Sequence, residues 1–327
     1  MSKILVTGTA GYIGSVVTEM LVEKGFDIAG IDNFQEGKKA AVNKNIRFYE
    51  GDFGSVDLLD KVFSENKIGC VFHLAAETTV EYSMSDPSAY FQNNIVNGLS
   101  LLNLMRSRQC HDIIFSSTAA TFGEPVYTPI DEKHPQLPIN SYGESKLMFE
   151  KILDWYHTAY GIRFNLFRYF NAAGATKTNG EDRRHESHLL PLILQTVSGK
   201  RQLLNVYGSD YSTPDGTCIR DYVHVIDVAE AHILAVKNLE KNPAGKYNLG
   251  SGIGFSNLEV IKTVEKVTGK NVNWKFSGRR SGDPAVLVAS NEHAKSELGW
   301  NPVNSSIEQI AGDAYNWLAA HPKGYVE

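Results

Sequence analysis

The feature that most constrains the fold is a glycine-rich turn near the start of the chain. Residues 3–8, KILVTG, are a short apolar, β-branched run, which predicts a buried strand. The turn then spaces Gly8, Gly11 and Gly14 three residues apart, ahead of a helical pattern over residues 16–24. Glycines permit a tight turn and a close backbone approach, and the start of the helix attracts a pyrophosphate. This strand, turn and helix predict a dinucleotide-binding βαβ unit.

An acidic residue follows the second predicted strand, residues 27–31. Asp32 lies 18 residues after Gly14, where a carboxylate would hold the hydroxyls of an adenosine ribose. A carboxylate at this place repels a 2′-phosphate, although Lys38 and Lys39 nearby weigh the other way. We therefore expect NAD rather than NADP as the cofactor.

Strand and helix patterns alternate through the first half of the chain. Further strands are expected at residues 46–49, 70–75, 112–117 and 162–170, and helices at residues 94–105 and from residue 141. Such alternation predicts a doubly wound parallel sheet covered by helices on both faces. We expect residues 1–176 to form the dinucleotide-binding domain. Residues 177–327 should form a smaller α/β substrate lobe, from which residues 219–248 return to pack on the main sheet.

The stretch SYGESKLMFE, residues 141–150, places Tyr142 and Lys146 four residues apart, on one face of a helix. With 15 Tyr in the chain, about one Tyr-x-x-x-Lys is expected by chance, so the spacing alone decides nothing. A tyrosine that acts as a base at neutral pH needs its pKa lowered by about three units, or roughly 4 kcal/mol. We expect one lysine to supply only part of this, so a second cation should lie nearby. An oxidised nicotinamide ring would serve.

A hydroxyl partner for this pair lies upstream. The strand at residues 112–117 delivers Ser116, Ser117 and Thr118 at its carboxyl end, where ligands of open α/β sheets bind. A hydroxyl, a phenol and an ammonium group beside a dinucleotide can take a proton off an alcohol while a hydride leaves the same carbon. The glycine turn, the strand-end hydroxyl and the Tyr142–Lys146 pair together resemble the extended short-chain dehydrogenase/reductase superfamily.

Motifs in the second half narrow this resemblance. They are Arg168-Tyr-Phe-Asn171-Ala-Ala-Gly174, His188-Leu-Leu-Pro191, Asn205-Val-Tyr207-Gly208, Gly216-Thr-Cys-Ile-Arg220-Asp221-Tyr222-Val-His224 and Gly278-Arg-Arg280-Ser-Gly-Asp283. In order, and over nearly the whole chain, these blocks closely resemble the UDP-glucose 4-epimerase family. The resemblance implies an NAD-dependent isomerase that interconverts UDP-galactose and UDP-glucose through a transient 4-keto sugar. It also implies a homodimer formed by the helices at residues 94–105 and 146–160.

The resemblance implies a role for each matching residue. Thr118 and Tyr142 would act on the sugar 4-hydroxyl, while Lys146 would hold a ribose and support the phenolate. The residues expected around NAD are Gly8, Gly11, Tyr12, Ile13, Gly14, Asp32, Asn33, Asp52, Phe53, Leu74, Ala75, Ala76, Asn94, Ser116, Tyr142, Lys146 and Tyr169. Those expected around the UDP-sugar are Thr118, Tyr142, Asn171, His188, Leu189, Asn205, Tyr207, Arg220, Tyr222, Arg280 and Asp283. The two arginines would bind phosphate.

Three positions bear on the choice of substrate and on the strength of the match. Many family members have Asn where His188 stands, and Ser where Thr118 stands. A threonine hydroxyl makes the same hydrogen bond. The counterpart of Leu287 lines the C2 side of the sugar, where a large Tyr excludes N-acetylated sugars and small residues admit them. Leu is intermediate, so a UDP-N-acetylhexosamine 4-epimerase stays open as an alternative.

Two rival functions can be weighed from the same residues. A nucleotide-sugar 4,6-dehydratase needs an acid pair directly after the strand-end threonine, and this chain has Ala119 and Ala120 there. A catalytically inactive dinucleotide sensor needs the glycine turn alone. The presence of Thr118, Tyr142 and Lys146 together argues against it.

Composition excludes other broad classes. The net charge of −5 argues against a general nucleic-acid or membrane surface. Cys70, Cys110 and Cys218 are few and scattered, which indicates a reducing compartment rather than a disulfide framework or a zinc cluster. The apolar run from Lys3 leaves no room for a signal peptide, and no run approaches the ~18 apolar residues of a membrane span. We expect a cytoplasmic protein.

Two motifs that suggest ligand sites have structural explanations. The residues Glu181, His185, Glu186 and His188 are of metal-binding types, but they lack a helical pair of histidines or a cysteine partner. We therefore expect no metal site. The glycine-rich residues 250–254 lack the lysine of a phosphate loop, and Ser256 with Glu259 predicts a helix capping box instead.

Overall fold

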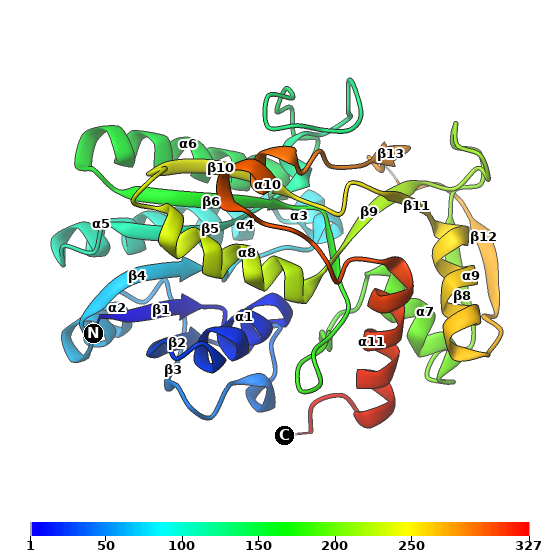
Figure 1. The fold of residues 1–327 in the computed structure, drawn as a ribbon, viewed down its shortest axis with the longest axis horizontal. Helices are drawn as coiled ribbons and strands as arrows, with labels where there is room; N and C mark the ends of the chain where they lie inside the picture. Colours follow the sequence, from blue (N-terminus) through cyan, green and yellow to red (C-terminus); the bar gives the residue numbers. More distant parts are fainter. Residues whose placement is uncertain (1, 281, 327) are drawn as a thin grey trace.

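The structure is a computed structural model that describes residues 2–280 and 282–326 (Figure 1). Its strands are β1 (Lys3–Thr7), β2 (Ile28–Asp32), β3 (Arg47–Glu50), β4 (Ile68–His73), β5 (Asp112–Thr118), β6 (Arg163–Tyr169), β7 (Asn171–Ala173), β8 (Leu204–Tyr207), β9 (Ile219–His224), β10 (Ala244–Leu249), β11 (Gly254–Ser256), β12 (Trp274–Ser277) and β13 (Val286–Leu287). Its α-helices are α1 (Tyr12–Glu23), α2 (Val56–Glu65), α3 (Val80–Ser85), α4 (Pro87–Phe91), α5 (Gly98–Ser107), α6 (Ser141–Tyr160), α7 (Leu189–Val197), α8 (Val225–Asn238), α9 (Asn257–Thr268), α10 (Glu292–Leu298) and α11 (Ile307–Ala320). Three short turns complete the chain: η1 (Lys39–Ala41) and η3 (Ala119–Thr121) are 3₁₀ helices, and η2 (Gln92–Asn97) is a π-helix.

The predicted parallel sheet is confirmed. Seven strands lie in the order β10-β6-β5-β4-β1-β2-β3, and every neighbouring pair is parallel. The chain runs outward from β1 through β2 to β3 and then crosses back to β4 on the other side of β1. Strand order therefore reverses between β1 and β4, which is where ligands bind in open α/β sheets.

Helices cover both faces of this sheet (Figure 1). On β1, Ile4 and Val6 belong to a core cluster with residues of α1, α8 and α10. Leu5, which points to the opposite face, belongs to a second cluster with residues of α2, α5 and α6. Because both faces are buried, the strands can be continuous apolar runs, which is what the sequence of residues 3–8 indicated.

The first helix begins earlier than its periodicity predicted. It starts at Tyr12 rather than at residue 16, because the turn after β1 needs only the residues from Gly8 to Gly11. Gly8 adopts φ +80°, a conformation that L side chains rarely adopt. A Cβ on Gly14 would lie 1.9 Å from the carbonyl oxygen of Gly8. The glycines thus let the first turn of α1 contact the strand end directly.

The helix α6 confirms the prediction from residue 141 onward. The Asn140 side chain accepts a hydrogen bond from the Gly143 N–H at 2.8 Å, which caps the helix start, and Gly161 ends the helix at φ 68°. The prediction of one regular helix over residues 94–105 was wrong in its first turn. That turn is the π-helix η2, in which Asn94 Nδ2 donates to Ser145 Oγ at 3.0 Å. Apolar periodicity does not report a hydrogen bond of this kind.

The second half of the chain forms smaller sheets and a helical cluster beside the main sheet. The helices α7, α9 and α11 pack together with the pair β8–β12, and they lie at one end of the molecule in Figure 1. The strand β9 pairs with β7, β11 and β13. The helix α8 and the strand β10 instead join the main sheet and its covering layer.

The predicted capping box is confirmed: Ser256 and Glu259 start α9. The three cysteines are free and buried. Within the described residues, no helix combines the length and the apolar character that crossing a membrane requires.

Candidate functional site

A cavity of about 890 Å³ opens at the carboxyl ends of the main-sheet strands, and residues of both halves of the chain line it. Its volume is at the upper end of the range for small-molecule sites. The predicted site residues in its wall are Gly8, Gly11, Tyr12, Ile13, Gly14, Asp32, Asn33, Phe53, Leu74, Ala75, Ala76, Ser116, Thr118, Tyr142, Tyr169, Asn171, His188, Leu189, Asn205, Tyr207, Arg220, Tyr222, Arg280 and Asp283. Of the predicted site residues, all of which are described, Asp52, Asn94 and Lys146 lie outside the wall.

The glycine turn fits a dinucleotide pyrophosphate. A Cβ on Gly8 would lie 2.8 Å from the Ala75 amide nitrogen, so backbone lines this part of the cavity closely. The N-cap residue of α1 is Gly11, which offers no side chain to cap the first backbone N–H groups. These donors and the positive end of the helix dipole are therefore available to an anion.

The carboxylate at the end of β2 is oriented by backbone amides. Asp32 Oδ2 accepts from the Ala10 N–H and Oδ1 from the Phe34 N–H, each at 2.8 Å. Burial raises the pKa of Asp32, and these amides oppose the rise. Each oxygen keeps further lone pairs for a ribose hydroxyl. Asp52 instead shapes its own turn, because it accepts from the Gly54 N–H at 2.6 Å and from Asn33 at 3.3 Å.

The proton-transfer pair lies where β5 and α6 meet. Thr118 is the last residue of β5, Tyr142 lies in the first turn of α6, and their hydroxyls are hydrogen-bonded. Burial is the main influence on Tyr142 and raises its pKa above the ordinary value near 10. The hydrogen bond from Thr118 and the charge of Arg183 lower this pKa. A phenolate at Tyr142 is thus stabilised from two sides against the cost of burial.

The lysine of the pair is buried and bound to the end of β5. Lys146 is 2% exposed and donates from Nζ to the Ser116 carbonyl at 2.8 Å. Burial lowers the pKa of Lys146 to about 7, while Glu150 raises it. The charge of Arg183 also lowers the pKa of Tyr142.

A buried ion pair supports the two strands that carry the site. Arg168 on β6 donates to Glu150 on α6, with Nη2 2.7 Å from Oε2, and both side chains are 2% exposed. The Ser117 hydroxyl donates to the other oxygen of Glu150. Because Ser117 precedes Thr118 on β5, this network fixes α6 relative to the end of that strand.

The side of the cavity formed by the second half carries the predicted arginines. Arg220 is largely buried and donates to Asp283 and to the Pro284 carbonyl, the latter at 2.7 Å. These two acceptors orient the guanidinium of Arg220. A phosphate bound here would accept hydrogen bonds from the same guanidinium group as Asp283. Arg280 lies 4.2 Å from the ring centroid of Tyr207. The side-chain amide oxygen of Asn205, Oδ1, is buried without a partner among the described residues, so a donor on a ligand would satisfy it.

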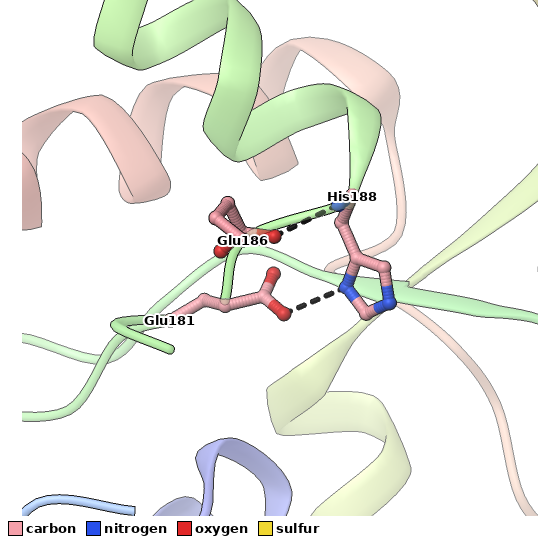
Figure 2. A group of neighbouring side chains, drawn as sticks. All are labelled: Glu181, Glu186 and His188. Atoms are coloured by element: carbon pink, nitrogen blue, oxygen red, sulfur yellow. Dashed lines mark hydrogen bonds and ion pairs between the residues drawn. The ribbon is translucent and has the colours of Figure 1, made fainter. Parts of the chain in front are cut away.

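Figure 2 shows three of the four residues that were considered as metal ligands: Glu181, Glu186 and His188. One ligand atom from each lies within 4.8 Å of the others, whereas His185 lies apart, 3.4 Å from Glu36. Glu181 Oε1 is 2.7 Å from His188 Nδ1 and also accepts from Arg183 Nε at 2.8 Å. A metal ion at Glu181 would therefore have to displace two donors.

The residue that sequence reasoning missed is Arg183. It lies in the polar segment before α7, lines the cavity, and donates from Nη1 to Thr78 Oγ1 at 3.4 Å. No spacing relates it to Tyr142, and its second partner, Thr78, lies more than a hundred residues earlier in the chain. The available signal was two adjacent arginines, Arg183 and Arg184, in a chain of net negative charge.

Both the sequence and the fold are similar to those of known proteins. Residues 4–250 match the NAD dependent epimerase/dehydratase family. The UDP-glucose 4-epimerase of Lacticaseibacillus casei is 47% identical over 325 residues, 98% of each chain. A crystal structure of a UDP-glucose 4-epimerase superposes with a TM-score of 0.97 at 44% identity and covers all of both chains. The enzyme from Bifidobacterium longum, crystallised with NAD⁺ and UDP, gives a TM-score of 0.95 at 37% identity, covering 99% of this chain and 100% of its own. The chain therefore belongs to the NAD dependent epimerase/dehydratase family and, within it, to the UDP-glucose 4-epimerases.

Proposed function

We propose that this protein is an isomerase that inverts C4 of a UDP-hexose, interconverting UDP-galactose and UDP-glucose with the help of NAD. The observation that carries the proposal is that Thr118 and Tyr142 line one cavity with the glycine turn and the arginines Arg220 and Arg280. A base, a dinucleotide cradle and phosphate-binding groups are what the reaction requires.

The first step removes the proton of the 4-hydroxyl group and a hydride from C4. The Tyr142 phenolate accepts the proton of the 4-hydroxyl, and the Thr118 hydroxyl, hydrogen-bonded to the phenol, orients the sugar oxygen. Bound NAD supplies the two-electron acceptor that takes the C4 hydride and later returns it. The C4–O bond becomes a carbonyl, so a 4-keto sugar is present while Tyr142 holds the proton.

Inversion requires the 4-keto sugar to present the opposite face of its C4 carbonyl to the returning hydride. Arg220 and Arg280 hold the diphosphate, about which the sugar turns. The side-chain Oδ1 of Asn205 accepts a hydrogen bond from the nucleotide. After the hydride returns, Tyr142 gives its proton back to the C4 oxygen. The cavity volume of about 890 Å³ supports the proposal that the sugar has room to turn.

We assign the cofactor side of the cavity to residues 1–176 and the UDP-sugar side to residues 177–327. Asp32 binds the adenosine ribose, and the glycine turn binds the pyrophosphate. Lys146 holds the nicotinamide ribose if its Nζ leaves the Ser116 carbonyl. Asp52 and Asn94 act indirectly, by shaping the backbone at residues 52–54 and 77.

The test is Tyr142→Phe, with Tyr160→Phe at the exposed end of the same helix as the control. We expect Y142F to lower kcat by about 10²-fold or more with little change in KM, and Y160F to behave as the wild type. NMR of UDP-galactose and UDP-N-acetylgalactosamine in parallel reports C4 inversion. The proposal fails if the wild type inverts neither sugar after NAD is added, or if Y142F turns over at the wild-type rate.

Acceptance of N-acetylated sugars is a second part of the proposal. Leu287 lines the cavity and is partly exposed to it. Its side chain is smaller than Tyr, so we propose that UDP-N-acetylhexosamines are accepted more slowly than UDP-hexoses. A 4,6-dehydratase is disfavoured, because Ala119 and Ala120 offer no acid for the elimination of water.

We also propose a homodimer in the cytoplasm. The predicted dimer helices carry exposed apolar side chains, of which Val96, Met148 and Trp155 are 48%, 37% and 72% exposed. Patches of this kind mark interfaces. Trp155→Glu should give a monomer in analytical ultracentrifugation, and a dimer that survives this change would contradict the proposed interface.

A further inference from the structure

The side chain of Arg183 bridges two parts of the cavity wall. Its Nε is 2.8 Å from Glu181 Oε1, and its Nη1 is 3.4 Å from Thr78 Oγ1. Glu181 is itself held by His188, as Figure 2 shows. Only 21% of the Arg183 side chain is exposed. The guanidinium is therefore held in one place by a carboxylate of its own segment and by a hydroxyl that follows β4.

The segment that receives Arg183 also supports Tyr142. The residue after Thr78 is Thr79, whose carbonyl accepts a hydrogen bond from the Tyr90 hydroxyl. The Tyr90 ring meets the Tyr142 ring edge to face, with centroids 6.3 Å apart. Thr78, Thr79, Arg183 and Tyr142 all line the same cavity. The guanidinium of Arg183 and the phenol of Tyr142 thus line one cavity. Arg183 contacts Thr78 directly, and Tyr142 contacts Tyr90, which is bound to Thr79.

Four other groups act on the surroundings of Tyr142. Lys146 on the same helix donates to the Ser116 carbonyl, and its pKa is lowered to about 7. Tyr90 and Tyr169 are neutral, since burial raises the pKa of both. Thr118 contributes a hydrogen bond without charge.

The charges that face Arg183 come from its own segment and from α6. They are Glu181, Glu186 and Tyr142, and all three favour the charged guanidinium. His188 is paired with Glu181. Against the larger effect of burial, the charge of Arg183 lowers the pKa of Tyr142, and Tyr142 in turn favours the charged guanidinium.

We propose that Arg183 is a positioning residue for proton transfer, because its guanidinium, aimed by Glu181 and Thr78, is a second cation that favours the Tyr142 phenolate. The inference rests on the proposed function only in taking Tyr142 as the base. Unlike the nicotinamide ring, this cation is present at every stage of the reaction. While the cofactor is reduced and uncharged, Tyr142 holds the proton, and the charge of Arg183 then favours return of that proton to the C4 oxygen.

The experiment compares Arg183→Gln, which removes the charge and keeps hydrogen-bonding capacity, with Arg183→Lys, which keeps the charge. Arg184→Gln removes the same charge at an exposed neighbouring position and is the matched control. Two readouts are taken. One is the pH profile of kcat, and the other is the ultraviolet titration of Tyr142, isolated by subtracting the same variant that also carries Y142F.

We expect R183Q to move the acid limb of kcat and the Tyr142 titration upward by about one pH unit, the order expected of one charge across a protein cleft. At a pH below that limb, kcat should fall about tenfold, and it should recover at high pH. R183K should keep more than half of the wild-type effect, and R184Q should match the wild type. Thr78→Val, which removes one hydrogen bond that aims the guanidinium, should give a smaller shift in the same direction.

The proposal is overturned if R183Q lowers kcat equally at every pH, if R184Q produces the same shift, or if R183Q only weakens the retention of NAD or raises KM for the UDP-sugar. If R183Q does not fold, R183K and T78V carry the test, and an unmoved Tyr142 titration in T78V then overturns it. The ultraviolet titration needs no turnover. A wild type without epimerase activity would therefore refute the proposed function and leave this test intact.

Discussion

Two glycines in helices should respond in opposite directions to the same substitution. Gly14 lies in α1 and Gly312 in α11, so helix propensity alone predicts that alanine stabilises each by about 1 kcal/mol. The surroundings differ. A Cβ on Gly312 would come no closer than 3.8 Å, to Val267 Cγ1, whereas a Cβ on Gly14 would lie 1.9 Å from the Gly8 carbonyl oxygen.

The size of the effect at Gly14 follows from what blocks the new methyl group. The obstacle is backbone, which cannot rotate away, so the helix must move by about 1 Å to restore the 3.0 Å that real Cβ contacts keep. Overpacking of this kind costs about 1–3 kcal/mol, occasionally more. After the gain in helix propensity, we expect Gly14→Ala to lose about 2 kcal/mol. At roughly 2 °C per kcal/mol in a chain of this size, the melting temperature should fall by about 4 °C.

The displaced turn should also lose its cofactor, because the N–H groups at the start of α1 move away from the pyrophosphate. Thermal unfolding of wild type, G14A and G312A is measured in parallel, and the NAD released by acid is quantified for each. G312A should melt at or about 2 °C above the wild type with its full NAD content. The reasoning is refuted if G14A melts with the wild type and retains NAD, or if G312A falls as far as G14A.

Three further predictions follow from buried or cavity-lining side chains. Glu150→Ala leaves the Arg168 guanidinium buried without its partner and should lower the free energy of unfolding in urea by about 3–5 kcal/mol. The double replacement E150L/R168M should lower it less, and an equal loss would contradict this reasoning. Burial and the charge of Glu181 raise the pKa of Glu186 to about 7, so between about pH 4.5 and 7 the folded protein binds a proton that the unfolded chain has lost, and stability falls as pH rises through that window. Glu186→Gln should therefore raise the melting temperature relative to the wild type more at pH 8 than at pH 5, and an equal difference at both would count against it. Leu287→Tyr should lower, and Leu287→Ala raise, the ratio of NMR rates with UDP-N-acetylgalactosamine and UDP-galactose by about tenfold, and an unchanged ratio would remove Leu287 from the choice of sugar.

The sequence by itself determined the architecture of the first half. The run at residues 3–8, the spacing of Gly8, Gly11 and Gly14, and the acid at Asp32 depend on neighbours along the chain. Their strand, turn and helix are accordingly found within a few residues of where they were expected. The same holds for the start of α6 at residue 141, because helix caps are local hydrogen bonds.

The tertiary structure decided which charged groups meet. The i, i+4 spacing places Lys146 on the same helix face as Tyr142, but its ammonium group is held by the Ser116 carbonyl on β5. Arg183 has no spacing relation to Tyr142, yet it lines the same cavity, because Thr78 and Glu181 receive its guanidinium from segments more than a hundred residues apart. Periodicity encodes which face of an element is buried, since burial repeats with the backbone geometry. The partner of a single long side chain depends on where unrelated segments come together, and that is settled only when the chain has packed.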